Sequence, residues 1–178
     1  MHKDCERILI SEEELNSIVE DIAKRINEDY KGKNLLLVGL LKGSIAFMAD
    51  LMKKLEVDCK IDFICVSSYG SSTESSGRVN IIKDVSQSVE GMDILIIEDI
   101  IDSGNTLAFI LKYFEAKGAN SVKICTLLSK PSRRVVQIPV DYIGREIPDE
   151  FVIGYGLDYA EKYRNLPYVG ILKRSVYS

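Results

Sequence analysis

The sequence predicts a single α/β domain with a mostly parallel central sheet flanked by helices. Short apolar runs alternate with amphipathic helical patterns, which is the β–α–β order of a parallel sheet. Several of these runs are apolar at successive positions, as strands buried on both faces are. A length of 178 residues suits one domain with a sizeable core, so we interpret residues 1–178 as one domain.

The first 66 residues predict two helices and two strands. Ser11 begins a capping-box pattern, and apolar residues at helical spacing follow it, so we expect a helix over roughly 12–29. The apolar run 34–40 is interpreted as a buried strand, and a second helix is expected to start near Ser44. The run 61–66 suits an internal strand covered on both faces.

Residues 67–80 break the apolar pattern. They contain six serines and two glycines and present no packing face. A long polar stretch inside a compact domain is usually functional or disordered, and the sheet pattern resumes after it. We therefore interpret residues 67–80 as a mobile lid loop rather than a domain linker.

The remaining elements complete the alternating pattern. Apolar positions at helical spacing from Leu107 to Phe114 predict a helix that Gly118 ends as a C′ glycine. Strands are expected over 81–82, 93–97, 122–128, 140–143, 151–153 and 168–172.

Composition and charge argue against several classes of function. The net charge of −4 lacks the basic excess of a general nucleic-acid binder. No apolar run reaches the roughly 18–20 residues that span a bilayer, and the first residues lead into no secretory signal, so we expect a cytoplasmic protein without a membrane partner. The four cysteines form no C-x-x-C pair and the single histidine is His2, which argues against a zinc site or a base-activated catalytic thiol.

Residues 93–107 are the most informative segment, because an apolar strand leads there into three carboxylates and a small polar turn. Glu98, Asp99 and Asp102 can accept hydrogen bonds from hydroxyls or face a hard cation. The turn 103–106 begins a helix, whose N-terminus offers free N–H groups and a positive dipole end to a phosphate. A tight turn with incidental acids is the weaker alternative, since acids at a buried strand end are costly. The pattern predicts a site for a phosphorylated sugar at the ligand-binding edge of the sheet.

Two other segments carry cations at strand ends. Residues 39–44 look superficially like a P-loop, but they have three residues between the glycines instead of four, so we set a nucleotide triphosphatase aside. Lys42 lies at a helix start and can still bind an anion. Lys130 ends a strand beside the expected crevice, which favours a ligand contact, whereas Arg133 and Arg134 are interpreted as a solvated basic turn.

These motifs together resemble one enzyme family. Residues 98–106 resemble the phosphoribosyl pyrophosphate (PRPP) motif of the type I phosphoribosyltransferases, two carboxylates after an apolar strand and then Asp-Ser/Thr-Gly-x-Thr. With Leu-Lys-Gly at 41–43, Ser-Tyr-Gly at 68–70, Lys130 and Phe-Val-x-Gly-Tyr-Gly-x-Asp at 151–158, the chain is similar to the bacterial 6-oxopurine (hypoxanthine) branch of that family. The resemblance covers about residues 8–174.

The resemblance implies the type I phosphoribosyltransferase fold. A small hood built from chain-terminal segments, with a purine-binding part over about 130–174, would cover the crevice, and the lid loop would close over it. Members of the family also form homodimers or homotetramers, so either assembly is expected here.

It further implies how PRPP is held. Glu98 and Asp99 would bind the ribose hydroxyls directly or through Mg²⁺, and Asp158 would help to hold a second Mg²⁺. Lys42, Gly43 and Arg164 would contact the pyrophosphate, and the peptide before Lys42 is often cis in this family. The 5′-phosphate would lie in the loop formed by Asp102, Ser103, Gly104, Asn105 and Thr106.

The purine contacts follow from the same resemblance. Lys130 would donate to the 6-oxo group, and the backbone of Val152 would contact the edge of the base. Phe151 would stack on the base, although taken alone it is interpreted as a core residue. Asp102 would be the catalytic residue that handles the proton on purine N7 as N9 attacks ribose C1′. The lid residues Ser68 and Tyr69 would help to exclude water.

The implied reaction is a purine-salvage step. Mg²⁺-dependent transfer of the 5-phosphoribosyl group from PRPP to hypoxanthine, and to guanine, would give IMP or GMP and pyrophosphate. Adenine should be a poor substrate, because its 6-amino group would meet Lys130 as donor against donor. A PRPP-binding regulatory protein and a phosphoribosyltransferase for another base are the alternatives, and the preference among hypoxanthine, guanine and xanthine stays open.

Overall fold

The computed structural model describes residues 1–68 and 79–177, so most of the proposed lid lies outside the described residues. The larger sheet that these residues form has the order β4-β3-β2-β5-β6-β7, and its neighbouring strands are parallel except β4, which is antiparallel to β3. This arrangement confirms the predicted α/β class with a mostly parallel central sheet. The strands are β2 (Leu35–Leu41), β3 (Cys59–Ser68), β4 (Val79–Lys83), β5 (Asp93–Ile101), β6 (Ser121–Ser129) and β7 (Tyr142–Glu146).

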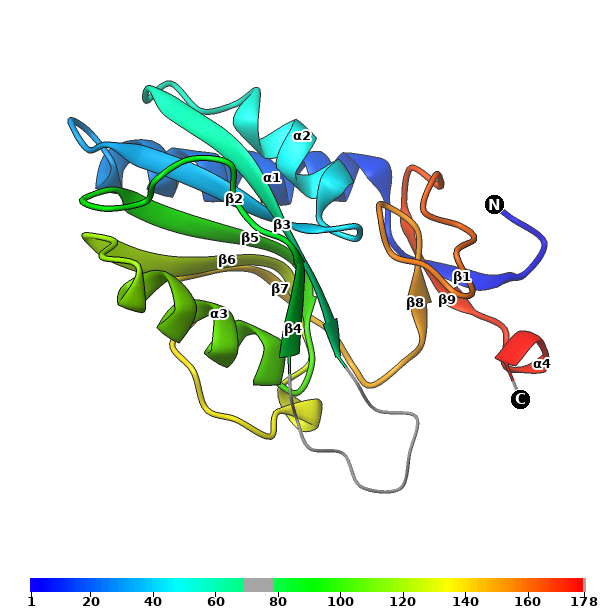
Figure 1. The fold of residues 1–178 in the computed structure, drawn as a ribbon. Coiled ribbons are helices and arrows are strands. Elements are labelled where there is room, and N and C mark those ends of the chain that lie inside the picture. Colours follow the sequence, from blue (N-terminus) through cyan, green and yellow to red (C-terminus); the bar gives the residue numbers. More distant parts are fainter. Residues whose placement is uncertain (69–78, 178) are drawn as a thin grey trace.

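Helices cover both faces of this sheet. α1 (Glu12–Asp29) and α2 (Ile45–Met52) lie on one face, and α3 (Asn105–Ala116) lies on the other (Figure 1). Two buried apolar clusters result, one beneath α1 and α2 and one beneath α3. The central strands of the large sheet are buried on both faces, so they appear in the sequence as continuous apolar runs.

The helix ends follow the local sequence signals. The Ser11 hydroxyl accepts a hydrogen bond from the Glu14 N–H at 3.2 Å, and the Glu14 carboxylate accepts one from the Ser11 N–H at 2.8 Å, which confirms the capping box of α1. After α3, Gly118 has φ +81°, a conformation that glycine adopts without strain, so the predicted C′ glycine is also confirmed.

A second, antiparallel sheet is built from both ends of the chain. β1 (Cys5–Ile10) pairs with β9 (Val169–Leu172), which pairs in turn with β8 (Val152–Ile153). The short helix α4 (Arg174–Tyr177) and the N-terminus lie beside this sheet (Figure 1). We call β1, β8, β9 and the connection between β8 and β9 the hood.

Several expectations about strands need correction. β5 continues to Ile101 instead of ending at 97, so the two carboxylates belong to the strand itself. β3 is not covered on both faces, since Ile61 is 43% exposed. β1 has no counterpart among the expected strands, because Glu6 and Arg7 interrupt its apolar pattern. β7 falls within 130–174 but pairs with β6 in the large sheet.

The topology places the ends of β2 and β5 side by side. β3 flanks β2 on one side, and β5, β6 and β7 follow on the other. The strand order therefore reverses between β2 and β5, and ligands bind at such a switch point, outside the carboxyl ends of the strands. Lys42 and Gly43 follow β2, and Glu98 and Asp99 stand near the end of β5, so the fold brings these predicted site residues together.

Candidate active site

Two adjacent carboxylates stand near the end of β5. Glu98 is buried, and its Oε1 accepts a hydrogen bond from the Asp99 N–H at 3.1 Å. Asp99 Oδ1 accepts one from the Ile100 N–H at 2.8 Å. Burial raises the pKa of both carboxyls, and the charge of Asp99 raises the pKa of Glu98 further. Within the described residues, neither carboxylate forms an ion pair with a lysine, arginine or histidine.

This pair of carboxylates fits Mg²⁺. Glu98 is buried beside a second carboxylate, and neither is in an ion pair with a cationic side chain of the described residues, so the pair carries a desolvation cost that a divalent cation offsets. Mg²⁺ in phosphate-binding sites is usually held by one or two carboxylates together with water and substrate oxygens. A larger protein cage is therefore not required, and in the described ranges no three His, Cys, Asp or Glu residues gather in a metal-binding group.

The turn after β5 presents free backbone N–H groups. Gly104 has φ +86°, which lets the chain turn directly into α3. The N–H groups of Ser103, Gly104, Thr106 and Leu107 have no hydrogen-bond acceptor among the described residues. Together with the dipole of α3, these groups can bind a phosphate. A hollow of about 250 Å³ opens here, lined by the turn, Glu98 and the last residues of β2.

The segment after β2 is enclosed between β5 and the hood. The peptide between Leu41 and Lys42 is cis, as the resemblance implies. A Cβ at Gly43 would overlap the Asp99 carboxylate, and a Cβ at Gly156 in the hood would overlap the carbonyl oxygen of Gly43. The lack of a side chain at both glycines therefore lets backbone, carboxylate and hood meet at one place.

Glu161 contacts both cations that were expected to bind pyrophosphate. Its carboxylate lies 2.8 Å from Lys42 Nζ and 3.6 Å from Arg164 Nη2. The hydrogen bond from Lys42 lowers the pKa of Glu161. Arg164 also pairs with Asp158 at 2.9 Å and donates to the carbonyl of Gly156 at 2.7 Å. Three predicted site residues therefore lie around Glu161, a residue that the sequence did not indicate. They are Lys42, Asp158 and Arg164.

Lys130 and Asp102 face each other at the ends of β6 and β5. Lys130 is only 8% exposed, and its Nζ lies 4.0 Å from Asp102 Oδ1. The N–H of Lys130 donates to the carbonyl of Ile101 at 3.0 Å, which fixes the start of this side chain. A buried ammonium beside a carboxylate offers one donor and one acceptor to the edge of a planar ligand.

The sequence context of Phe151, taken alone, predicted a core residue, and the structure shows that this prediction is wrong. Phe151 is 36% exposed, and its ring stacks on Tyr177 of α4 with centroids 5.0 Å apart. Tyr159 packs against the same ring edge-to-face at 5.4 Å. Val152 follows in β8 and is buried. The ring is therefore supported by other aromatics while part of it stays accessible to a ligand.

The prediction of a solvated turn at 133–134 is correct for only one of the two arginines. Arg133 is exposed and pairs with Asp149 at 2.7 Å. Arg134 is half-buried, and its Nε donates to the carbonyl of Asp102 at 3.0 Å. The sequence does not distinguish the two neighbours, because the direction of each side chain depends on the short 3₁₀ turn Pro131–Arg133.

Two predicted residues fall in the proposed lid, whose ends need correction because residues 67–68 belong to β3 and residues 79–80 to β4. Ser68 is the last residue of β3, where its backbone pairs with Val79 of β4. Tyr69 lies outside the described residues. Their contacts with a ligand therefore stay predictions.

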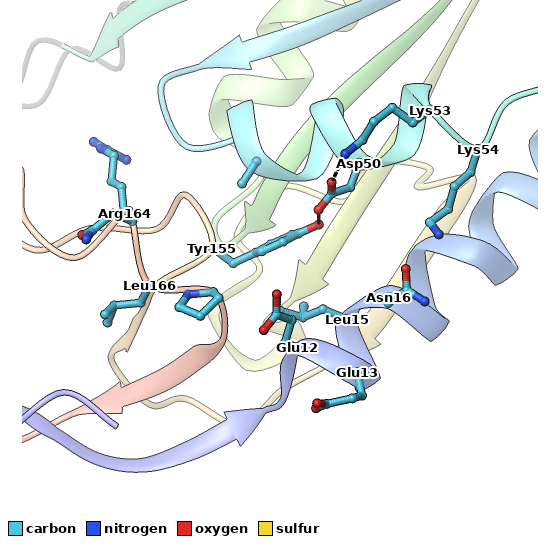
Figure 2. A pocket seen from close by; sticks show the side chains of 13 residues that line it. Glu12, Glu13, Leu15, Asn16, Asp50, Lys53, Lys54, Tyr155, Arg164 and Leu166 are labelled. Carbon is cyan, nitrogen blue, oxygen red and sulfur yellow. Dashed lines mark hydrogen bonds and ion pairs between the residues drawn. The ribbon is translucent and has the colours of Figure 1, made fainter.

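A larger hollow, of about 870 Å³, lies between α1, α2 and the hood (Figure 2). Its lysines and Asp50 are already paired, since the Tyr155 hydroxyl donates to Asp50 at 2.6 Å and Asp50 pairs with Lys53 at 2.8 Å. Lys54 on the same wall pairs with Glu20 at 3.1 Å. We place the candidate active site at the smaller hollow, which is lined by the turn with the free N–H groups and by the unpaired carboxylate of Glu98.

Comparisons with known proteins identify the family of this chain. The family model for the phosphoribosyl transferase domain matches residues 10–160. A hypoxanthine-guanine phosphoribosyltransferase of Bacillus subtilis is 54% identical over 177 residues, which cover 99% of this chain and 98% of the relative. The bifunctional protein TilS/HprT of Listeria monocytogenes is 53% identical over the whole chain, which spans only 28% of that relative's length.

Solved structures give the same result. A crystal structure of a hypoxanthine phosphoribosyltransferase from Staphylococcus aureus is 50% identical and has a TM-score of 0.96, covering 100% of this chain and 97% of the other. At this similarity the backbone of the described residues, hood included, follows that of the relative. In the described residues, no helix is both long and apolar enough to cross a membrane.

Proposed function

The chain belongs to the phosphoribosyltransferase domain family and, within it, to the hypoxanthine-guanine phosphoribosyltransferases, and from this premise we propose that it salvages 6-oxopurines in the cytoplasm. The reaction transfers the 5-phosphoribosyl group of PRPP to N9 of hypoxanthine or guanine and yields IMP or GMP and pyrophosphate. The observation that carries the proposal is the 4.0 Å pairing of Lys130 with Asp102 beside a turn of free N–H groups.

The purine is bound by three groups. Lys130 donates to the 6-oxo oxygen, Phe151 stacks on the ring, and the backbone of Val152 contacts the edge of the base. The C1′–N9 bond forms as the bond from C1′ to the pyrophosphate oxygen breaks. Asp102 accepts the proton from purine N7, which balances the charge of the new bond. Adenine is rejected because its 6-amino group is itself a donor.

PRPP is bound across the switch point. The N–H groups and hydroxyls of residues 103–106 hold the 5′-phosphate, and Glu98 and Asp99 hold the ribose hydroxyls and Mg²⁺. When bound there, Mg²⁺ supplies positive charge that stabilises the leaving pyrophosphate. Asp158 would help to hold a second Mg²⁺, and Ser68 and Tyr69 would belong to the lid that covers the site. The pyrophosphate itself is held by Lys42, Gly43 and Arg164.

An assay with PRPP and Mg²⁺ tests the proposal, with hypoxanthine, guanine, xanthine and adenine compared in parallel. Turnover of hypoxanthine or guanine with adenine inert is the expected result.

Asp102→Ala should lower kcat by ~10²–10⁴-fold and leave PRPP binding largely intact. Lys130→Ala should raise KM for hypoxanthine much more than KM for PRPP. PRPP binding without turnover of any base would instead favour a regulatory protein.

We also propose that the chain forms a homodimer or homotetramer, as the resemblance implies. Light scattering of the purified protein distinguishes these two assemblies. A monomer at micromolar concentration would contradict the proposal.

A further inference from the structure

Arg134 is hydrogen-bonded to the start of the turn that follows β5. Its Nε donates to the carbonyl oxygen of Asp102 at 3.0 Å, and its Nη2 donates to Ser129 Oγ at 3.0 Å. Ser129 ends β6 and is only 2% exposed. One guanidinium therefore ties the start of the turn to a buried point in the neighbouring strand.

The residues after Arg134 continue this contact. The N–H groups of Val135 and Val136 both donate to the carbonyl oxygen of Ser103, at 3.0 and 2.9 Å. Gly104 packs against the same segment, since a Cβ there would lie 2.8 Å from the carbonyl oxygen of Val136 and 3.2 Å from Arg134 Cδ. Two successive carbonyls of the turn are thus held by residues 134–136.

Holding these carbonyls determines where the ligand-facing N–H groups point. In a trans peptide, the C=O of one residue and the N–H of the next point in opposite directions. The bond to the Asp102 carbonyl therefore directs the Ser103 N–H away from Arg134, and the bonds to the Ser103 carbonyl direct the Gly104 N–H in the same way. Both N–H groups are among those without an acceptor in the described part of the chain.

We propose that Arg134 is a positioning residue that holds the turn 102–104 in its anion-binding conformation before the ligand arrives. That the anion is the 5′-phosphate of PRPP rests on the proposed function, whereas the role in ordering the turn does not. A planar guanidinium reaches two acceptors at once, which a single ammonium does with less geometric control. Without Arg134 the ligand must order the turn itself and binds more weakly.

The first test measures the order of the turn in the free protein by backbone ¹⁵N relaxation. Arg134→Gln is compared with Arg134→Lys and with Arg133→Gln, the matched control, which loses only the exposed ion pair with Asp149. We expect the order parameters of Ser103 and Gly104 to fall from about 0.85 to below about 0.6 in Arg134→Gln. The order parameters of Arg134→Lys should be intermediate, and those of the Arg133→Gln control should equal the wild-type values. If Arg134→Gln does not fold, Arg134→Lys replaces it in this comparison. Wild-type order parameters in both Arg134 variants would overturn the proposal.

The second test uses two ligands that occupy different parts of the proposed site. Ribose 5-phosphate and inorganic pyrophosphate are titrated separately into each variant by calorimetry. Arg134→Gln should bind ribose 5-phosphate about 10- to 100-fold more weakly and pyrophosphate within about twofold of wild type. An equal loss for both ligands would indicate general damage and contradict the proposal. If wild type binds neither ligand, the proposed function fails, and the relaxation data alone decide the role of Arg134.

Discussion

Glu98 is a carboxyl whose charge the protein does not stabilise by any cationic side chain in the described residues. Burial and the neighbouring Asp99 raise its pKa. The folded protein therefore holds a proton on Glu98 more tightly than the unfolded chain does, and stability falls as the pH rises from the ordinary glutamate range through the raised pKa. At neutral pH this site costs stability, as binding sites often do.

We expect Glu98→Gln to raise Tm at neutral pH in the absence of Mg²⁺. The neutral amide removes the buried charge, and a gain of 1 kcal/mol would raise Tm by about 2–4 °C for a chain of this size. The rise in Tm over wild type should shrink near pH 4, where the wild-type carboxyl is protonated. The variant should lose the proposed phosphoribosyl-transfer activity at every pH. Thermal unfolding at several pH values checks this, with the exposed Glu115→Gln as control. A lower Tm for Glu98→Gln at pH 7 would contradict the argument.

If Lys42 and Arg164 bind pyrophosphate as proposed, Glu161 competes with pyrophosphate for these two cations. Its carboxylate lies 2.8 Å from Lys42 Nζ and 3.6 Å from Arg164 Nη2, so an incoming anion must displace it. We expect Glu161→Gln to bind pyrophosphate about 3- to 10-fold more tightly, because the amide no longer neutralises the two cations. Product-inhibition kinetics measures the effect, and Glu115→Gln again serves as control. Weaker pyrophosphate binding would mean that Glu161 supports the site instead of competing with its ligand.

At the scale of elements, Asp62 joins β3 to the segment after β4. Burial alone would raise its pKa, but hydrogen bonds from the N–H and hydroxyl of Ser86 and from the N–H of Phe63, with the charge of Lys83, lower it to about 2. The folded pKa lies below the unfolded value near 3.9, so this stabilisation is present above that value and is lost as the pH falls toward 2.

Asp62→Asn should therefore destabilise the protein at pH 7 by about 2 kcal/mol, the range for hydrogen bonds to a charged group. The difference in the free energy of unfolding between Asp62→Asn and wild type should become smaller as the pH is lowered below 4. Urea unfolding at pH 7 and pH 3 measures it, and Asp58→Asn, an exposed aspartate just before β3, is the control. A difference that stays constant between these pH values would show that charge is not the cause.

At the scale of the whole molecule, glycines allow the hood to meet the large sheet. Gly156 has φ +97°, and a Cβ there would overlap the carbonyl oxygen of Gly43. Gly32 has φ +72° but has open space where a Cβ would stand. Both positions strain an alanine backbone by about 1 kcal/mol, so the pair separates this strain from the close contact.

We expect Gly156→Ala to lose more stability than Gly32→Ala, by at least about 2 kcal/mol, because the overlap is with backbone rather than with a movable side chain. It should also weaken pyrophosphate binding, since Gly43 must shift. Denaturant unfolding and pyrophosphate titration check the two effects. Equal stability of the two variants would show that the hood has room to move away from the sheet.

The sequence by itself determined the features that lie within one short stretch of chain. The strand, the carboxylates, the polar turn and the helix N-terminus of residues 93–107 are consecutive, so hydrophobic pattern and turn chemistry suffice to identify them. The capping box at Ser11 and the C′ glycine at Gly118 are local in the same way. The roles implied for Lys42, Lys130 and Arg164 could be inferred only from the order in which several motifs occur along the chain.

Only the tertiary structure decided which residues complete the site. Glu161 meets Lys42 across 119 positions of sequence, and Arg134 meets Asp102 across 32. Tyr177 supports Phe151 through a helix at the end of the chain. The contacts of Glu161 and Tyr177 depend on β1, β8 and β9 folding into a hood over the switch point, whereas the contact of Arg134 depends on β5 and β6 lying side by side. Local patterns report only the hydrophobic face and the turn chemistry of each segment, so they cannot show which distant charges a chain brings together.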